Sequence, residues 1–292
     1  MSIEVVIKEK RPRYEFNVGY LTKYGNKYKV SHNAVVIRKG TSIEKKARGS
    51  NPNKLDCNMR RSKKMIKDYG LCNDWQFFVT FTLDQMKQDR YNLSLYIKKL
   101  SHSIRNLNRS RNEKIEYLLI PEQHKDGAWH MHGFIRGLKE NEYVFAKKRK
   151  GRDVFHWIMY KEKFGFCDME FIEDRDKAVS YLMKYITKDL SRSVSEINAK
   201  SYYCSKGLNK PEIIKKGIVS SKYNPCYEKK IEERVVYSEM WLRDDIPEEI
   251  ASSYIDDTPN GYTKSIFEFE KYDVNKFTGE MISEIPESWK SN

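Results

Sequence analysis

Two histidines separated by one residue are the feature of this sequence best suited to chemistry. His130 and His132 flank Met131 within residues 129–135. Side chains alternate between the two faces of a β-strand, so both imidazoles point to one face while Met131 points to the core. Two imidazoles on one face can together hold a single divalent metal ion.

A predicted β-hairpin brings a carboxylate beside these imidazoles. Residues 125–127 read Lys-Asp-Gly, a strong turn signal, and residues 117–124 before them have the composition of a strand. Pairing the two strands places Glu122 roughly opposite His130, while His124 has the same parity and is the alternative third ligand. Two nitrogens and one carboxylate with open positions are typical of a catalytic metal site rather than a structural one.

A second chemical feature is a helix that carries tyrosines and lysines on one face. Helical spacing predicts a buried face of Val179, Leu182, Met183 and Ile186. The same spacing predicts an opposite face of Tyr181, Lys184, Tyr185 and Lys188. A tyrosine hydroxyl can attack a DNA phosphate and form a covalent ester. That reaction needs a Lewis acid at the phosphoryl oxygen and positive charge near the phenolate, which the hairpin and the lysines would supply.

These stretches, in this order, resemble the HUH endonuclease superfamily, specifically the rolling-circle replication initiators of plasmids and small single-stranded DNA phages. Residues 78–82, Phe-Val-Thr-Phe-Thr, resemble the first motif of that family, which is a core strand. Glu122 with residues 130–132 resembles the second motif, the metal site. Residues 181–188 resemble the third motif in its two-tyrosine form, Y-x-x-K-Y-x-x-K, and the whole resemblance covers roughly residues 75–190.

The resemblance implies a role for each matched residue. Tyr181 matches the nucleophile, Tyr185 matches the tyrosine that alternates with it, and Lys184 matches the lysine that assists at the scissile phosphate. Lys188 completes the expected catalytic set. Mg²⁺ or Mn²⁺ is expected at Glu122, His130 and His132, where it would polarise the scissile phosphate.

The elements that must position these residues predict an α+β fold. A dense run of β-branched and aromatic residues at 76–83 predicts a central strand. An amphipathic helix is predicted over 88–107 and a further strand over 167–172. The family core is a ferredoxin- or RRM-like antiparallel sheet with helices packed on it. We expect three segments, namely a basic N-terminal extension with a hairpin and a helix (1–74), the HUH endonuclease domain (75–230) and an acidic C-terminal extension (231–292).

The charge of the chain indicates a polyanionic partner. The net charge is +14, although residues 231–292 hold 6 Lys and Arg against 15 Asp and Glu. The first 230 residues are therefore strongly basic, which is typical of proteins that bind nucleic acid. The basic residues that flank Gly151 suit a loop that follows phosphates. They are Lys147, Lys148, Arg149, Lys150 and Arg152.

The function predicted from the sequence is a replication initiator that nicks single-stranded or origin DNA. It would leave a 5′-phosphotyrosine and a free 3′-OH, and a host helicase and polymerase are expected partners because no P-loop motif occurs. The five cysteines are widely spaced without a C-x-x-C, and no long apolar run occurs, so we expect the cytoplasm of a bacterial host and no membrane contact.

Three alternatives to this function remain open from the sequence. A transposase of the HUH type would use the same chemistry. A non-enzymatic module for single-stranded nucleic acid would use the sheet alone. An iron oxygenase would use the two histidines and the carboxylate as a facial triad, but the basic charge and the tyrosine helix favour DNA chemistry instead.

Overall fold

The chain folds into two units, each built around an antiparallel sheet. The computed structural model describes residues 13–38, 52–193, 200–231, 234–257, 273–274 and 281–282. One unit is Arg48–Pro211, and the other combines Met1–Ala47 with Glu212–Asn292. Helices accompany antiparallel strands in both units, so the predicted α+β fold class is confirmed. The three-segment division stays a prediction beside this grouping of the chain.

The unit Arg48–Pro211 contains a sheet of seven strands in the order β6-β7-β8-β3-β5-β4-β9. The strands are β3 (Phe77–Leu83), β4 (Glu116–Gln123), β5 (Trp129–Arg136), β6 (Tyr143–Arg149), β7 (Arg152–Trp157), β8 (Gly165–Phe171) and β9 (Tyr203–Cys204). The strand predicted over 76–83 is β3, and it lies in the middle of the sheet between β8 and β5. Its β-branched and aromatic residues suit a strand that is covered on both faces.

Four α-helices and a short 3-10 turn complete this unit. They are α1 (Pro52–Cys72), α2 (Leu93–Arg109), η1 (Glu140–Glu142), α3 (Ile158–Lys163) and α4 (Arg175–Ser193). The helix predicted from residue 88 begins later, at Leu93, because the Asn92 side chain accepts a hydrogen bond from the Leu95 N–H at 2.9 Å. Asparagine is a favoured N-cap, and it fixes the first turn of the helix at this point.

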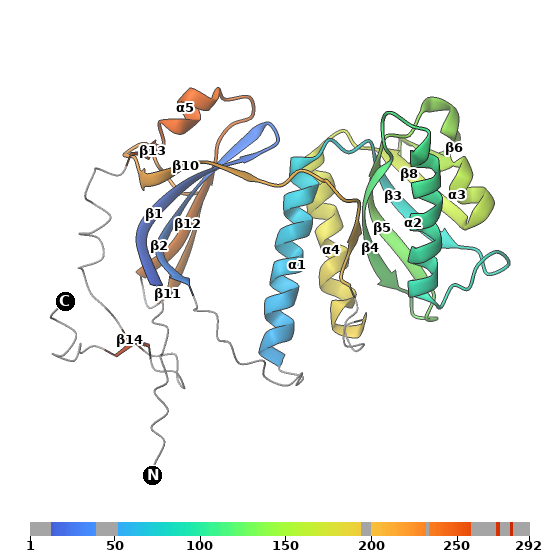
Figure 1. Ribbon diagram of the computed structural model, residues 1–292, viewed down its shortest axis with the longest axis horizontal. Coiled ribbons are helices and arrows are strands. Elements are labelled where there is room, and N and C mark those ends of the chain that lie inside the picture. The colour runs from blue at the N-terminus through green and yellow to red at the C-terminus, as the bar shows by residue number, and fades with distance from the viewer. Residues whose placement is uncertain are drawn as a thin grey trace, which may run out of the picture. The chain divides into compact units, whose positions relative to one another are not determined.

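The two faces of this sheet are covered by different helices. Phe77, Val79 and Phe81 point to one face, where they pack with buried residues of α2 and α3. The intervening residues of β3 point to the other face, where α1 and α4 lie (Figure 1). The apolar face forms the main core of the unit, and the opposite face carries the polar residues singled out by the sequence.

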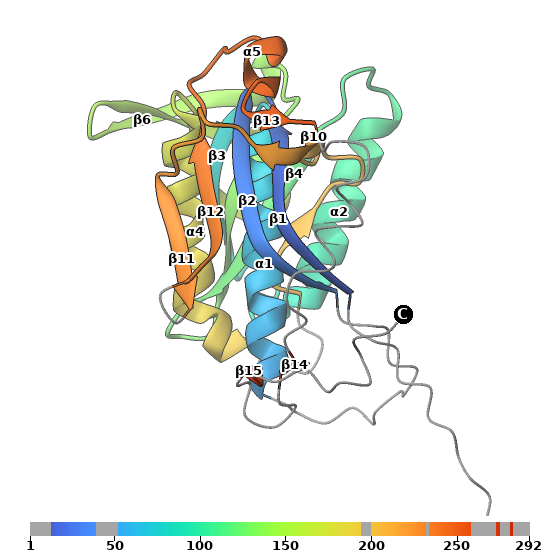
Figure 2. The same cartoon turned by 90° about the vertical axis from the view of Figure 1, so that its left-hand side faces the viewer.

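The other unit is a six-stranded sheet made from both ends of the chain, in the order β11-β12-β2-β1-β10-β13. Its elements are β1 (Arg13–Tyr24), β2 (Lys27–Arg38), β10 (Glu212–Val219), β11 (Tyr227–Ile231), β12 (Arg234–Trp241), α5 (Glu248–Ser252) and β13 (Ile255–Asp256). Figure 2 shows β11, β12, β2 and β1 side by side. The hairpin predicted about Gly25 and Asn26 is confirmed as the turn between β1 and β2.

A small core holds the six-stranded sheet together. Leu21 and Val30 from the N-terminal hairpin pack with Leu242, Ala251 and Ile255 from the acidic C-terminal region. The two ends of the chain therefore share one core. A separate pair of two-residue strands, β14 (Asp273–Val274) and β15 (Met281–Ile282), lies further along the chain.

None of the helices in the described part of the chain is both long enough and apolar enough to cross a membrane.

Candidate active site

The β4–β5 hairpin brings together the three predicted metal ligands. Strands β4 and β5 pair so that Glu122 lies opposite His130, which confirms the predicted pairing. Gly127 closes the turn with a positive φ of 86°. Its N–H donates to the His124 carbonyl at 2.9 Å. The tight turn fixes the register, so Glu122, His130 and His132 all point to the sheet face on which α4 lies.

Two threonines of the neighbouring strand β3 contact the histidine rings. Thr80 lies opposite His132 and Thr82 lies opposite His130. The Thr80 hydroxyl is 3.2 Å from Nδ1 of His132, and the Thr82 hydroxyl is 3.0 Å from Nδ1 of His130. Each ring therefore has its Nδ1 engaged and its Nε2 turned toward the open side of the site. Such contacts orient imidazoles for a metal ligand at the other nitrogen.

His132 and Glu122 form the tightest pair in the site. Nε2 of His132 lies 2.5 Å from Oε2 of Glu122. Because a carboxylate only accepts hydrogen bonds, the Nε2–H of His132 donates to Glu122. This hydrogen bond holds the pKa of the Glu122 carboxyl below its usual value, despite partial burial. Glu122 is therefore an anion beside the imidazole at neutral pH, as a metal ligand must be.

His130 lies in a different environment, between Thr82 and His124. Partial burial is the main cause that lowers the pKa of His130 to about 4, and the neighbouring imidazoles of His124 and His132 add to it. The ring is therefore neutral at physiological pH. The exposed His124 ring stacks on it, with centroids 3.7 Å apart and planes 9° from parallel. A neutral imidazole keeps a nitrogen lone pair for a metal ion or a proton.

Metal binding at this cluster requires a small rearrangement. Among the residues that the structure describes, no group of three or more His, Cys, Asp or Glu side chains is gathered closely enough to hold a metal ion. The hydrogen-bonding proton between His132 and Glu122 occupies the position that a cation would take. The donor set of two imidazoles and one carboxylate suits a divalent ion once that proton leaves.

Helix α4 carries the predicted tyrosines across the same face of the sheet. The Asp174 side chain accepts a hydrogen bond from the Lys177 N–H at 3.0 Å, an N-cap arrangement at the start of the helix. Val179 and Leu182 are buried, as the helical spacing predicted. A Cβ at Gly70 of α1 would lie 2.7 Å from a methyl of Val179, so the two helices pack at a distance that only glycine permits at this position.

The two tyrosines of α4 lie over the histidine cluster. The ring of Tyr185 stacks on the ring of His132, with centroids 3.9 Å apart and planes 12° from parallel. The Tyr185 hydroxyl donates a hydrogen bond to the Tyr181 hydroxyl at 2.9 Å. Tyr181 is the more exposed of the two, and its ring packs edge-on against Phe78 of β3. The phenols and the imidazoles therefore share one site.

Burial, followed by the hydrogen bond to Tyr181, raises the pKa of Tyr185 above its ordinary value. Tyr185 is thus a neutral phenol that donates, and Tyr181 is the phenol whose oxygen accepts. The ammonium of Lys184 lies 5.4 Å from the ring centroid of Tyr181, where it adds positive charge beside that hydroxyl. Lys188 belongs to α4, but its side chain lies outside the described residues.

The basic residues predicted as a loop form the tip of a β-hairpin instead. Strands β6 and β7 pair up to Arg149 and Arg152, and the turn is made by Lys150 and Gly151, which both have positive φ. The loop prediction was wrong because cross-strand pairing at this hairpin is set by contacts outside the segment. Arg149 donates to Asp168 at 2.8 Å and to Glu170 of β8 at 2.5 Å.

Three other basic side chains of the hairpin form longer ion pairs. The ammonium of Lys147 is 3.6 Å from Asp168, and that of Lys148 is 3.7 Å from Asp153. Arg152 is 3.5 Å from Glu170. All three cations are largely exposed, so a phosphate can approach them.

A groove of about 970 Å³ runs between the hairpin and α4. Tyr181, Lys184 and Tyr185 line one side of the groove, and Arg149 and Arg152 line the other. The groove therefore joins the predicted catalytic helix to the predicted DNA-binding residues. It brings together the two sets that the sequence placed about thirty residues apart.

The sequence did not single out the residues of β3 and β8 that complete this face. Thr80 and Thr82 belong to a strand that the sequence identified only as structural. Asp168 and Glu170 belong to a strand recognised by its alternation, without a role. The available signal was that alternation, because it predicts a polar face on a strand next to the histidines.

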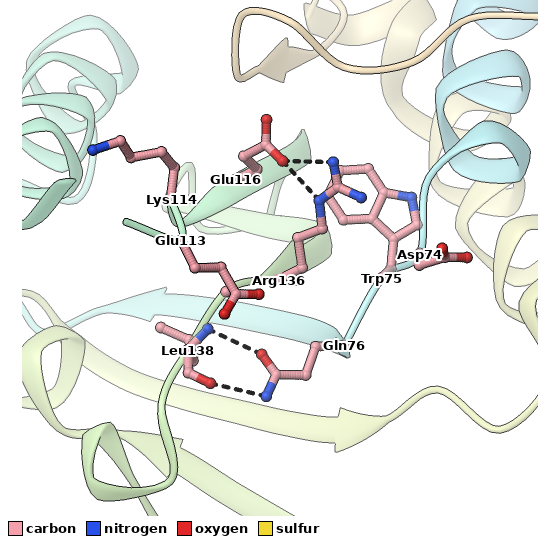
Figure 3. Close-up of a pocket in the computed structure, with 9 residues that line it drawn as sticks. Asp74, Trp75, Gln76, Glu113, Lys114, Glu116, Arg136 and Leu138 are labelled. Carbon is pink, nitrogen blue, oxygen red and sulfur yellow. Dashed lines mark hydrogen bonds and ion pairs between the residues drawn. The ribbon is translucent and has the colours of Figure 1, made fainter. Parts of the chain in front are cut away.

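A second cavity, of about 640 Å³, lies at the opposite end of β3 (Figure 3). Its polar groups are already paired within the protein. Arg136 bonds to Glu116 and lies over the Trp75 ring, and the Gln76 amide pairs with both backbone groups of Leu138 at 3.0 Å. The cavity therefore has the features of a packed corner of the sheet rather than of a ligand site.

Comparison with known proteins supports a role in replication for this part of the chain. No curated protein and no solved structure matches the chain. A family model for replication-associated proteins of the ORF2 type matches residues 76–190. The matched region begins next to β3, includes the β4–β5 hairpin and ends within α4, so every predicted catalytic and metal-binding residue falls inside it. In this region the chain is similar to replication-associated proteins, which is consistent with a replication initiator.

Proposed function

We propose that this protein starts rolling-circle replication by nicking DNA at an origin through HUH-type tyrosine transesterification. One observation carries the proposal, namely the stack of Tyr185 on His132 at 3.9 Å together with the hydroxyl-to-hydroxyl bond from Tyr185 to Tyr181. It brings two nucleophilic oxygens next to a potential cation site on an exposed face. The match to a replication-associated family supports the same interpretation.

The metal ion of this reaction would be held by Glu122, His130 and His132. When bound, Mg²⁺ or Mn²⁺ supplies a Lewis acid that polarises a phosphoryl oxygen. The hydrogen bonds of Thr80 and Thr82 to the two Nδ1 atoms leave Nε2 as the donor atom on each ring. Glu122 approaches His132 and is favoured as the third ligand, while His124 stacks on His130 and flanks the set.

Tyr181 is the first nucleophile in this proposal. Its oxygen forms a bond to the phosphorus of the scissile phosphate as the bond from phosphorus to the 3′ oxygen breaks. The products are a 5′-phosphotyrosine and a free 3′-OH, which primes synthesis by a host polymerase. The hydrogen bond donated by Tyr185 and the ammonium of Lys184 stabilise the Tyr181 phenolate as its proton leaves.

Tyr185 becomes the second nucleophile once the origin is copied. It attacks the regenerated origin phosphate, and the 3′-OH released by that attack displaces Tyr181 to rejoin the first strand. Each step exchanges one phosphodiester for another, so neither needs a high-energy cofactor. A host helicase would separate the strands, and the groove beside Arg149 and Arg152 would hold the unwound strand.

Covalent labelling of the protein tests this proposal. Wild-type protein is incubated with circular single-stranded DNA of its own replicon and Mn²⁺, and adducts are resolved on a denaturing gel. Tyr181→Phe should lose most of the adduct, and Tyr181→Phe/Tyr185→Phe should lose all of it. Tyr91→Phe, which removes a hydroxyl from an exposed tyrosine outside the site, should label like wild type.

Two results would overturn the proposal. One is full labelling of the double variant, which would place the nucleophile elsewhere. The other is DNA binding of undiminished strength in EDTA with no adduct under any metal condition, which would identify a non-enzymatic binding module. An HUH-type transposase would label in the same way, and it would be recognised by cleavage at the ends of a mobile element instead of at an origin.

A further inference from the structure

Phe166 of β8 is an apolar side chain on an otherwise polar face of the sheet. It lies opposite Thr82, whose hydroxyl bonds His130, so Phe166 points to the same face as the histidines. Its side chain is 61% exposed. Two strand spacings, roughly 10 Å, separate it from β5 and therefore from the imidazole cluster.

The backbone holds this exposed ring in a fixed position. A Cβ at Gly165 would lie 2.4 Å from the Asp84 backbone nitrogen, so the start of β8 approaches β3 as closely as glycine allows. The Asp84 N–H also donates to the Phe164 carbonyl at 2.9 Å. Phe166 therefore stands on a rigid strand rather than on a loop, and its ring makes no aromatic contact with the residues that the structure describes.

Two cations converge next to this ring. Asp168 follows Phe166 on the same face of β8, about 7 Å further along the strand. The Asp168 carboxylate pairs with Arg149 at 2.8 Å and with Lys147 at 3.6 Å. Both basic side chains stay about half exposed, at 47% and 54%. An exposed ring and two accessible cations are thus separated by about the length of one nucleotide.

We infer that Phe166 is a stacking platform for an unpaired base of single-stranded DNA beside the scissile phosphate. Lys147 and Arg149 hold the neighbouring phosphate. Single-strand binding sites combine aromatic rings with basic residues in this way, because every base has a face that can stack. In a duplex both faces of each base are covered, so the ring would have nothing to stack on. The inference rests on the proposed function and defines which DNA the site takes.

The test measures DNA binding without catalysis. Fluorescence anisotropy in EDTA follows binding of a fluorescein-labelled single-stranded oligonucleotide of mixed sequence to the full-length protein. Phe166→Ala should weaken binding roughly ten-fold, since loss of one stacked base costs on the order of 1–3 kcal/mol. Phe166→Tyr keeps a flat ring and should bind like wild type, whereas Phe166→Leu keeps only the apolar surface and should behave like alanine.

Two controls separate stacking from a general defect. Phe145→Ala removes a second exposed phenylalanine, which is 55% exposed and packs against Phe155 on the opposite face, and it should bind like wild type. An oligonucleotide with abasic positions offers phosphates without bases, so it should bind wild type and Phe166→Ala equally.

Equal affinity of wild type and Phe166→Ala for the normal oligonucleotide would overturn the inference. An equal loss of affinity for the abasic oligonucleotide would overturn it as well, because the ring would then not contact a base. A loss confined to duplex DNA or to a protein partner would also count against it. Since no step of the assay requires adduct formation, failure of the nicking reaction and failure of the stacking contact give different results.

Discussion

Each histidine of the site is defined by the groups on its two nitrogens. Thr80 and Thr82 engage the Nδ1 atoms, and the opposite side of each ring is left for Glu122 or a cation. Residues that orient a metal-binding imidazole contribute to affinity without touching the metal. The two threonines therefore have a role that extends beyond the stability of β3.

We expect Thr80→Val and Thr82→Val to raise the Mn²⁺ concentration needed for half-maximal adduct formation by roughly ten-fold each, because the rings lose their orienting partner. Valine keeps the shape and the β-propensity of threonine, so the sheet should remain intact. Adduct yield across a Mn²⁺ titration measures the effect. Thr80→Ser and Thr82→Ser retain the hydroxyl and serve as matched controls, and an unchanged metal requirement in the valine variants would contradict the orienting role.

At this scale the sequence predicted the chemical groups but not all of their partners. His130, His132 and Glu122 were recognised from their spacing, and Tyr181 and Tyr185 from a helical pattern. The hydroxyls of β3 and the ring of Phe166 could not be identified in this way. Their role depends on which strands are neighbours in the sheet, and local sequence does not encode that pairing.

At the scale of elements, the position of α4 over the sheet depends on its packing with α1. Gly70 permits the close approach, since a Cβ there would lie 2.7 Å from Val179. The tyrosines project from the same helix, so a change in the α1–α4 distance moves them relative to His132. Packing remote from the chemistry thus controls the geometry of the site.

Gly70→Val is expected to lower the free energy of unfolding by about 2 kcal/mol, because overpacking at a helix contact costs on the order of 1–3 kcal/mol. It should also reduce adduct formation, as α4 shifts away from the histidines. Thermal unfolding and covalent labelling check the two effects. Arg60→Val changes an exposed residue of the same helix and should leave both unchanged. Wild-type stability and labelling in Gly70→Val would rule out the packing argument.

Elements with strong local signals were predicted well. The β4–β5 hairpin, the central strand and the start of α4 lie where the periodicity and turn residues indicated. The β6–β7 hairpin was not predicted, because its tip is a run of charged residues without alternation. Its pairing is stabilised by the ion pairs of Arg149 with Asp168 and Glu170, which are contributed by a different strand.

At the scale of the whole molecule, the N-terminal hairpin depends on the C-terminal region. Strand β12 pairs with β2, and β10 pairs with β1. Ala251 and Ile255 bury the apolar side chains of the hairpin in a common core. The sequence located both the basic hairpin and the acidic region, but their pairing spans about two hundred residues and leaves no local trace.

Truncation after Lys230 should therefore unfold the six-stranded unit, since it removes β12, α5 and β13 and exposes Leu21 and Val30. Limited proteolysis with mass spectrometry should show rapid cleavage within β1 and β2 of the truncated protein. Sites within Arg48–Pro211 should stay protected in both proteins, because the core of that unit is built from its own residues. Equal protection of β1 and β2 in both proteins would show that the hairpin is stable alone.

The two-ended construction of the six-stranded sheet also constrains how a cell can make this protein. A ribosome releases β1 and β2 first and their partners β10 and β12 last. The contiguous segment Arg48–Pro211 can fold while synthesis continues, but the nascent hairpin keeps both of its edges unpaired until the C-terminal strands emerge. Chaperone demand during translation should therefore concentrate on the first strands of the chain and end only when translation does.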